Sequence, residues 1–383
     1  MKKLILFTIF ISMAGSLALN AQENKALKTF NETYVKAADW LVSQQNEDGG
    51  WAAQDGNSDV AFTGLIIAAF AKAPKEIRAK YAVQIEKGTK YILSCVQDDG
   101  KIINKGRIPE MANYKTAIAV MALVAVDKDK YIMQIGKAVT YLKTTQWSEK
   151  TGVSEKDMNY GGFGYDKNGE KPKSDLSNTG MSLDALHEAG VAKDDESWQK
   201  AVRFLNRVQQ RTESNDLAVQ LKKENITVLE DGGFIYDPMQ SKAGEITLPD
   251  GSKGLRSYGS MTYIGLKSFI YAFLDKKDPR VQAAYKWIQE HYTLEENPEL
   301  EKKGWYYYFE TFAKALNAYG EKTLKTPDGK EHFWAEELVN KLAQLQSKDG
   351  SWVNTDPKWF EDFKPLVTAY CLIAMDECYA WIK

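Results

Sequence analysis

The chain contains few of the residue types that build metal sites and disulfide frameworks. Its 383 residues include three cysteines and three histidines. The cysteines are Cys95, Cys371 and Cys378. Their odd number and unpaired spacing indicate buried thiols rather than disulfides. The histidines are His187, His291 and His332. A zinc site needs several convergent ligands, and these three are scattered, so we predict no metal ion and no cofactor.

An excess of positive charge is also missing. The chain has 50 basic and 52 acidic residues, so its net charge is −2. A nucleic-acid-binding surface needs a basic footprint, and we therefore expect no nucleic-acid partner. The composition leaves a small ligand in a cavity as the kind of partner to expect. It leaves the oligomeric state open.

Long apolar runs are missing except at the start of the chain. Lys2 and Lys3 precede the apolar segment Leu4 to Leu19, and the small residue Ala21 follows. This pattern is typical of a cleaved signal peptide over residues 1–21, which predicts export to the periplasm or beyond the cell. Because no other stretch is long and apolar enough, we expect no stable membrane span and one mature domain over 22–383.

A repeated unit is the strongest positive signal in the chain. Ser43-Gln44-Gln45-Asn46-Glu47-Asp48-Gly49-Gly50-Trp51 near the start corresponds to Leu345-Gln346-Ser347-Lys348-Asp349-Gly350-Ser351-Trp352 near the end. Weaker copies are Gly161-Gly162-Phe163 after Gln146 and Asp231-Gly232-Gly233-Phe234 after Gln209. The unit is a helix ending in Gln, an Asp/Gly turn and an aromatic residue. Such repeats determine the architecture.

Each turn is followed by a threonine and an apolar helical stretch. These threonines are Thr63, Thr116, Thr179, Thr262, Thr311 and Thr368. Stretches such as Ala117 to Val126 are apolar on nearly every side, whereas the alternate helices, such as Ala335 to Gln346, are amphipathic. Six buried and six amphipathic helices that alternate predict an all-α fold, an (α/α)6 toroid of inner and outer helices. An open superhelix is disfavoured because the units differ in length.

The largest insertion is 211–256, in which Glu245 to Gly251 predicts a turn or hairpin.

The repeat carries a family resemblance. Trp40-Leu41, Gln45 and Asp48-Gly49-Gly50-Trp51 resemble the QW repeat of squalene and oxidosqualene cyclases and of the related protein prenyltransferase β subunits. The runs Ser257 to Tyr263 and Trp305 to Tyr308 are similar to those of secreted bacterial prenyltransferase/squalene oxidase repeat proteins. The resemblance covers essentially the whole mature chain. It implies the toroid and an isoprenoid-like or other hydrophobic ligand in its central cavity.

The resemblance does not extend to the residues that carry known chemistry. Class II cyclases protonate an alkene with the middle Asp of Asp-x-Asp-Asp, and the matching segment here is Asp175-Leu176-Ser177-Asn178-Thr179. Ser177 occupies the donor position, and a hydroxyl is too weak an acid for this step. We therefore expect no squalene-type cyclisation unless another acid, such as Glu310, has taken over. The zinc ligands of protein prenyltransferases also have no counterpart.

The threonine register predicts which residues surround the mouth of the ring. Positions one and four residues before each Thr share a face at the N-terminal turn of an inner helix. From this register and the aromatic runs we take Asp175, Glu310 and Lys115 as candidate catalytic residues. The candidate ligand contacts are Asp59, Asn178, Tyr258, Tyr263, Tyr307, Tyr308 and Lys364. Asp59 and Asp175 can also be helix N-caps, and Lys115 and Glu310 can pair across the cavity or be solvated at its rim.

Two classes of function remain open. One is an enzyme that acts on an isoprenoid-like lipid, or on a polysaccharide as a lyase or hydrolase. The other is a non-catalytic binding scaffold. A cavity lined mainly by Leu, Phe and Trp would favour a lipid, whereas tyrosines with paired charges would favour a sugar.

Overall fold

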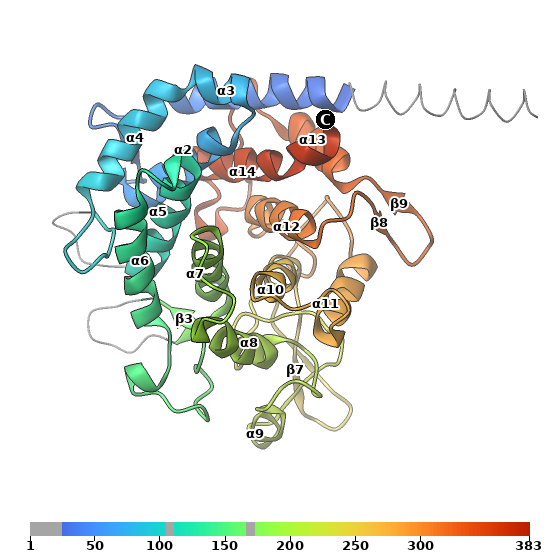
Figure 1. The fold of residues 1–383 in the computed structure, drawn as a ribbon. Coiled ribbons are helices and arrows are strands. Elements are labelled where there is room, and N and C mark those ends of the chain that lie inside the picture. The colour runs from blue at the N-terminus through green and yellow to red at the C-terminus, as the bar shows by residue number, and fades with distance from the viewer. Residues whose placement is uncertain (1–24, 105–110, 166–172) are drawn as a thin grey trace, which may run out of the picture.

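The computed structural model describes residues 25–104, 111–165 and 173–383. The predicted signal peptide, residues 1–21, lies outside the described residues. The described chain folds into two concentric layers of helices joined by short turns (Figure 1).

The inner layer is a closed ring of six helices. They are α2 (Val60–Lys72), α5 (Ala112–Asp127), α7 (Leu176–Glu188), α10 (Gly259–Tyr271), α12 (Trp305–Tyr319) and α14 (Lys364–Ile382). Each packs against the next, and α14 packs against α2 to close the ring. All six threonines of the register lie on these helices and are buried.

The outer layer alternates with the inner one along the chain. It comprises a helix over residues 25–42, then α4 (Ala82–Ser94), α6 (Ile132–Thr145), α8 (Glu196–Val208), α11 (Pro279–Glu290) and α13 (Trp334–Leu345). Two short helices, α3 (Lys75–Lys80) and α9 (Ala218–Lys223), lie in connections. The predicted all-α toroid is confirmed.

The two layers differ because their sequences differ. In α2, Val60 and all residues from Thr63 to Ala71 are buried, so the helix has no polar face that meets solvent. In α8 the buried residues, such as Trp198, Phe204 and Leu205, recur at helical spacing, with charged residues between them. A helix that is apolar all round must be covered on every side, which assigns it to the inner ring.

The repeated turn connects one outer helix to the next. Gln346 Nε2 donates to Gly350 O and to Thr33 O, both at 2.9 Å, and so joins the last unit to the first outer helix. Gln45, Gln146 and Gln209 make the corresponding two bonds, one within their own turn and one to the next outer helix. These bonds satisfy carbonyl groups that would otherwise be left unpaired at the helix junctions.

The threonine of the next inner helix holds the other side of the turn. Trp51 N donates to Thr63 Oγ1 at 2.9 Å. The same bond runs from Ile102 to Thr116, Phe163 to Thr179, Phe234 to Thr262 and Trp352 to Thr368. Thr311 differs, since its hydroxyl donates to Tyr308 O within its own helix at 3.0 Å. A buried acceptor at this position explains why Thr recurs in the sequence.

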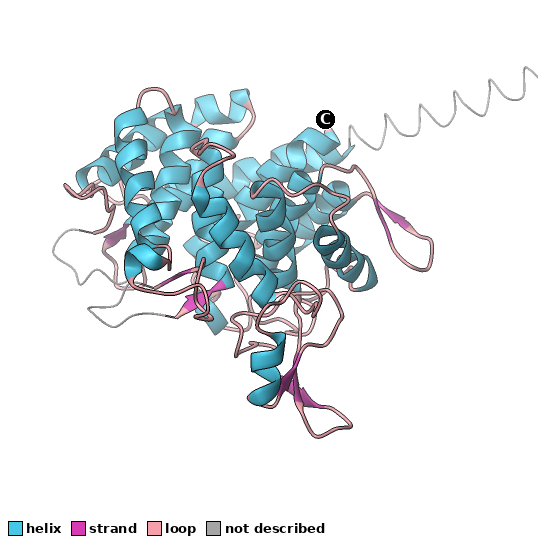
Figure 2. Cartoon of the chain, turned by 60° about the horizontal axis from the view of Figure 1, so that its bottom comes forward, coloured by secondary structure: helices cyan, strands magenta, loops and turns pink. Residues whose placement is uncertain are grey.

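Short β-structures lie at the ends of the helices (Figure 2). The antiparallel pairs are β1 (Trp51–Ala52) with β2 (Ser58–Asp59), β3 (Phe163–Gly164) with β4 (Ser174–Asp175), and β8 (Leu324–Lys325) with β9 (Glu331–His332). In the 211–256 insertion, β7 (Lys253–Leu255) pairs with β6 (Glu245–Thr247) and β5 (Ile226–Thr227). The hairpin predicted around Glu245 to Gly251 is confirmed. Two of these hairpins end at Asp59 and Asp175, directly before an inner helix.

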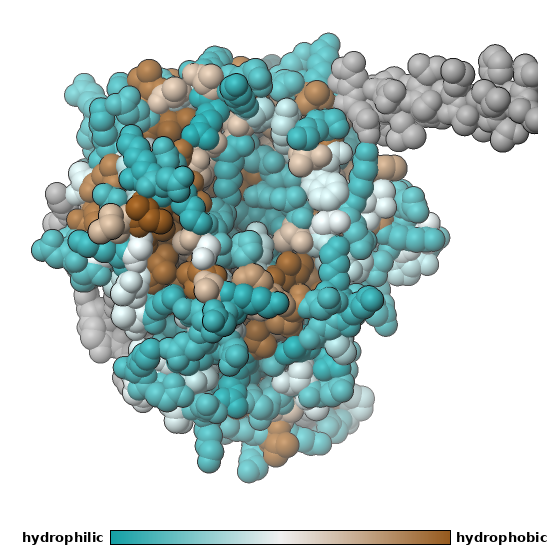
Figure 3. Space-filling view, in the orientation of Figure 1, coloured by the Kyte–Doolittle hydropathy of each residue, from teal (hydrophilic) through white to brown (hydrophobic). Residues whose placement is uncertain are grey.

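The three cysteines are buried and form no disulfide, as the sequence predicted. None of the helices in the described residues is long and apolar enough to cross a bilayer. Hydrophilic residues cover most of the face seen in Figure 1, and apolar residues lie on it in separate patches (Figure 3).

Candidate functional site

Asp59 and Lys115 form a close ion pair at the mouth. Asp59 caps α2 by accepting Ala61 N at 2.8 Å, and its other carboxylate oxygen lies 2.7 Å from Lys115 Nζ of α5. Lys115 also donates to Asn104 Oδ1 at 3.2 Å. The side chains are 6% and 16% exposed. Lys115 therefore pairs with Asp59 and not with Glu310, and the pair joins two neighbouring inner helices.

Asp175 occupies the equivalent position before α7 but has different surroundings. Its carboxylate accepts Asn178 N at 2.8 Å and Asn178 Nδ2 at 2.9 Å. The hydroxyl of Tyr236 also bonds to it, and Tyr165 and Tyr258 lie close by. Burial raises the pKa of Asp175 to about 7, which these hydrogen bonds only partly offset, and the nearby charge of Asp237 raises it further. Among the described residues, no cation pairs with this carboxylate.

Beside Asp175, side chains from four inner helices converge inside the ring. Ser177 Oγ of α7 and Tyr307 Oη of α12 share a hydrogen bond of 3.0 Å, and the hydroxyl of Tyr114 of α5 also bonds to Ser177. The rings of Tyr307 and Tyr370 of α14 lie 5.6 Å apart. Burial raises the pKa of Tyr114, Tyr307 and Tyr370 well above the usual value. For Tyr307 the charge of Glu310 adds to this effect. At this level the interior of the ring is therefore occupied by phenol hydroxyls next to a carboxylate.

A buried charge network fills the lumen below the tyrosines. Lys314 Nζ lies 2.6 Å from Glu310 Oε1 and 3.4 Å from Asp184 Oδ2, and Lys267 Nζ lies 2.5 Å from Asp184 Oδ2. All four side chains are at most 6% exposed. Although burial acts in the opposite direction, the carboxylates of Glu310 and Asp184 raise the pKa of Lys314 well above its usual value. The two lysines likewise hold the pKa of Asp184 below its usual range, against the effect of burial.

The lumen stays charged to the far end of the inner helices. Lys72, the last residue of α2, lies 2.7 Å from the carboxylate of Glu188, the last residue of α7. Because α5 stands between α2 and α7 in the ring, this pair spans the interior. We call the set Glu310, Lys314, Asp184 and Lys267 the central charge network.

The structure brings some of the predicted site residues together and separates others. Asp175, Asn178 and Tyr258 meet at one cluster, and Tyr307 and Glu310 meet beside Ser177. Tyr263 and Tyr308 instead pack against each other with ring centroids 5.5 Å apart, and Tyr308 donates to Thr293 O. Lys364 pairs at the surface with Asp349, 2.8 Å away. Whether any of these residues binds a ligand stays a prediction.

Several residues of the site escaped the sequence reasoning. Glu361 is fully buried and accepts Tyr307 N at 2.7 Å and Tyr306 N at 3.2 Å, which caps α12 from another loop. Burial raises the pKa of Glu361 to about 7. Tyr114, Tyr370 and Lys314 were also missed. Tyr370 and Lys314 lie three and four residues after register positions, so extending the register by one turn would have found them, whereas Tyr114 directly precedes Lys115 and lies off the register.

Comparisons with known proteins agree with the fold. Residues 7–165 match the model of the prenyltransferase α/α toroid domain. A variant of the type II terpene cyclase MstE from Scytonema is similar in structure, at 11% identity and a TM-score of 0.58, over 94% of this chain and 99% of that one. No curated protein matches the sequence.

Two carbohydrate-active enzymes are similar to a comparable extent. A GH76 α-mannanase from Bacteroides thetaiotaomicron aligns over 91% of this chain and 95% of its own, at 11% identity and a TM-score of 0.57. An α-amylase from Clostridium perfringens aligns over 90% and 97%, at 12% identity and a TM-score of 0.52. At such identities the likeness establishes the α/α-toroid fold alone. It confirms the resemblance to squalene-cyclase-like toroids at that level.

Proposed function

We propose that this toroid binds a saccharide at the mouth formed by the N-terminal ends of its inner helices, and that Asp175 acts there as a general acid or base. The observation that carries the proposal is the polar character of the side chains inside the ring. Tyrosine hydroxyls, Asp175 and the central charge network occupy the space where an isoprenoid binder would need an apolar wall. Tyrosines together with paired charges favour a sugar ring over a hydrocarbon chain as the ligand.

Asp175 has properties that suit acid–base catalysis near neutral pH. With a pKa of about 7, its carboxyl group is close to evenly divided between its two protonation states at that pH. Proton transfer is most efficient when the pKa of the catalytic group lies near the working pH. The same property makes it a poor proton source for an isolated alkene. Hydrolysis of a glycosidic bond, or elimination beside a uronic acid carboxylate, requires a proton transfer of the kind that Asp175 can perform.

The neighbouring tyrosines have two roles in this proposal. Tyr165 and Tyr236 bond to each other and to the Asp175 cluster, so they fix the carboxyl group and keep water away from it. Tyr307 and Tyr114 offer flat apolar rings with polar edges, which fit the alternating C–H faces and hydroxyl edges of sugars. Export, as residues 1–21 predict, would place the protein where polysaccharides are found. The mannanase and the amylase show that enzymes described as acting on carbohydrates have a similar α/α frame, as the terpene cyclase also does.

An isoprenoid ligand is the competing candidate, and one contact favours it. Phe62 of α2 and Phe363 stack edge to face at the mouth with centroids 5.2 Å apart, which is an apolar contact surface. A variant of the Scytonema cyclase is described in complex with geranylgeranyl dihydroxybenzoate, its substrate. Here, however, Ser177 stands in the position of the proton donor, and its hydroxyl is engaged by Tyr307. The site thus supports binding of such a chain better than its cyclisation.

Product analysis tests the proposal. The purified protein is incubated with α-mannan, amylose, cellulose and polygalacturonate, and in parallel with geranylgeraniol, and the products are identified by mass spectrometry. We expect saccharide products from the wild type and at least a hundredfold loss of rate in Asp175→Asn. Asp278→Asn is the matched control, because Asp278 caps the outer helix α11 in the same way but outside the mouth. Equal rates in wild type and Asp175→Asn, or turnover of geranylgeraniol alone, would contradict the proposal.

A further inference from the structure

Two large aromatic side chains stand exposed on the loop before α14. Trp359 is 39% exposed and Phe360 is 60% exposed. Both residues have left-handed backbone conformations, with φ values of 57° and 64°. Residues with a Cβ atom avoid this region unless the surrounding structure enforces it, and such strain concentrates at functional positions. The loop therefore holds two apolar side chains in solvent at a conformational cost.

The loop is fixed to the mouth of the ring by buried contacts. Glu361, next to Phe360, accepts the first backbone N–H groups of α12. Asn354 Nδ2 lies 2.6 Å from Glu361 Oε2 and 2.6 Å from Lys302 O. The Trp359 ring rests on Gly304, where a Cβ atom would come within 2.8 Å of it. One part of the indole is thus covered, and the loop is held in place from below.

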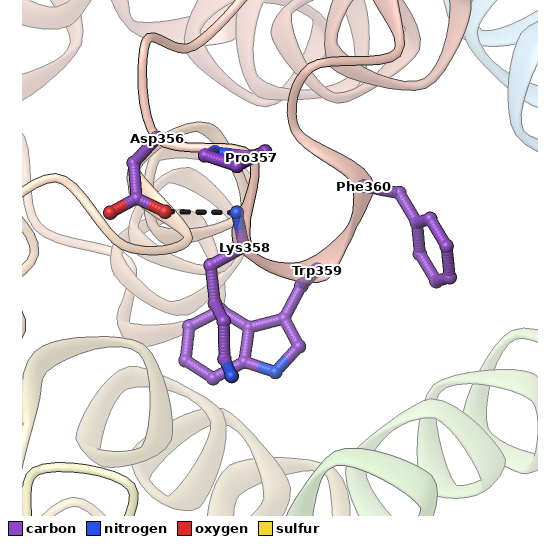
Figure 4. A pocket seen from close by; sticks show the side chains of 5 residues that line it. All are labelled: Asp356, Pro357, Lys358, Trp359 and Phe360. Carbon is purple, nitrogen blue, oxygen red and sulfur yellow. Dashed lines mark hydrogen bonds between the residues drawn. The ribbon is translucent and has the colours of Figure 1, made fainter.

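The exposed part of the loop borders a shallow, open hollow of about 430 Å³ (Figure 4). It is lined by Asp356, Pro357, Lys358, Trp359 and Phe360. The side chains of Lys358 and Trp359 project from the same side of the loop, and Lys358 Nζ lies 5.8 Å from the indole ring. Asp356 Oδ1 accepts Lys358 N at 2.9 Å. A flat apolar ring therefore has an ammonium group beside it, and a carboxylate lines another part of the hollow.

We propose that Trp359 is a stacking platform for one sugar ring of a saccharide whose reacting unit lies at Asp175. This inference rests on the proposed function and specifies how the chain would be held. A sugar ring has an apolar C–H face and a hydroxyl edge, so the face matches the indole and the edge matches Asp356 and Lys358. A hydrocarbon surface, such as a bilayer, would have to desolvate both charges, which disfavours it as the occupant.

The platform and the cluster at Asp175 belong to the same mouth. Glu361 binds Tyr307 N, and the Tyr307 hydroxyl bonds to Ser177, which lies two residues after Asp175. Phe363, which follows the platform, packs on Phe62 of α2. The loop that carries Trp359 is thus bonded to the helix whose tyrosine reaches the cluster at Asp175. Trp359 contacts the ligand away from the reacting bond and is a binding residue.

Binding measurements on the full mature chain test the platform. The probes are maltohexaose, mannohexaose, cellohexaose and hexagalacturonate, titrated calorimetrically into wild type, Trp359→Ala, Trp359→Phe and Asp175→Asn. For the hexasaccharide that binds wild type best, we expect Trp359→Ala to weaken binding about tenfold and Trp359→Phe to stay within about threefold. We expect Asp175→Asn to bind about as well as wild type while losing turnover. Met133→Ala, a 69% exposed apolar residue on α6, is the matched surface control and should not change affinity.

The outcomes separate the two proposals. If a hexasaccharide binds wild type and Trp359→Ala equally, the platform is overturned while the proposed function stands. If none of the four binds wild type, both are overturned. Co-sedimentation of the protein with phosphatidylcholine/phosphatidylglycerol vesicles that is lost in Trp359→Ala would assign the platform to a lipid surface instead and overturn the saccharide proposal. Thermal melts of each variant, which should match wild type within a few degrees, exclude unfolding as the cause.

Discussion

The ammonium group of Lys115 lies 2.7 Å from the carboxylate of Asp59, whereas Asp175, at the same cap position two inner helices later, is surrounded by tyrosines. The two aspartates that cap inner helices after a hairpin therefore differ: within the described residues Asp59 has a partner cation and Asp175 has none, although the junctions are otherwise similar. Both aspartates cap a helix, and burial raises the pKa of Asp175 to about 7. This contrast also supplies matched controls within one chain.

Removing the positive charge of Lys115 should destabilise the fold. We expect Lys115→Ala to lower the free energy of unfolding by about 1–3 kcal/mol, because the largely buried carboxylate of Asp59 loses its counter-charge. Lys364→Ala is the control, since its pair with Asp349 is 42% and 41% exposed and should contribute less than about 1 kcal/mol. Urea denaturation at neutral pH measures both. Equal effects would mean that the Asp59 pair is screened like a surface pair.

The contribution of Asp175 to the stability of the protein should fall as the pH rises from about 4 to about 7. The pKa of Asp175 is about 7 in the folded chain and 3.8 in its ordinary state, so the folded state binds the proton more tightly. Its contribution is fully present below the unfolded value and is lost as the pH rises through the folded value. Asp175→Asn should reduce this slope, by at most about 4 kcal/mol over the interval.

Glu361 should contribute to the same slope. Its pKa rises from 4.5 to about 7 on folding, which is the same direction. The double variant Asp175→Asn with Glu361→Gln should therefore show a flatter pH profile of stability than either single variant. Denaturant titrations at pH 4, 5.5, 7 and 8 give the profile. Equal pH profiles of stability in the wild type and the double variant would show that neither carboxyl group is desolvated as described.

The central charge network should behave as a coupled unit. Either Glu310→Gln or Lys314→Met leaves a buried charge with one partner fewer, and we expect each to cost about 3–5 kcal/mol. The double variant should cost clearly less than the sum, because neither charge of that pair then remains. Lys286→Ala, in the exposed pair with Glu290 on α11, is the control and should change stability by less than about 0.5 kcal/mol. Additive effects of the two core substitutions would contradict the coupling.

Gln346 should be important for closure of the ring. Its side-chain amide bridges Gly350 O and Thr33 O, so Gln346→Ala leaves two carbonyl groups without this donor, and we expect a loss of about 1–3 kcal/mol. Gln44→Ala is the control, because the amide of Gln44 bonds only locally to Ser43 among the described contacts. Hydrogen exchange should show faster opening of the helix over 25–42 and of α13 in Gln346→Ala. An unchanged exchange pattern would argue against this role.

No cyclic product should form from squalene. The donor position holds Ser177, and its neighbour Asn178 is bonded to Asp175. The double change Ser177→Asp with Asn178→Asp should not create a robust cyclase, because new carboxylates would meet the existing charge of Glu310 and the lumen would not guide a carbocation. Gas chromatography of the extracted reaction decides this. Hopene-like products from the unmodified protein would contradict it.

The repeat was sufficient to predict the toroid because its signals are local. The Gln-turn-aromatic unit and the following Thr are bonded within or between adjacent units, so their spacing along the chain carries over into space. Apolar residues on every side of α2 and α5 could have no place except in an inner layer. The positions of Asp59 and Asp175 as caps were likewise readable from the register.

Only the tertiary structure decided which charges meet. Lys115 pairs with Asp59 and not with Glu310, and Glu310 pairs with Lys314 of its own helix. Glu361 binds the first turn of α12 from a loop more than 50 residues later in the chain. Side chains reach partners across the ring through distances that the register does not encode, and burial then sets the pKa of each group. The sequence by itself determined the helices and their order, because hydrophobic periodicity and turn chemistry act between near neighbours. The electrostatics of the lumen emerged only on closure of the ring, because closure is what removes water from groups that lie far apart in the chain.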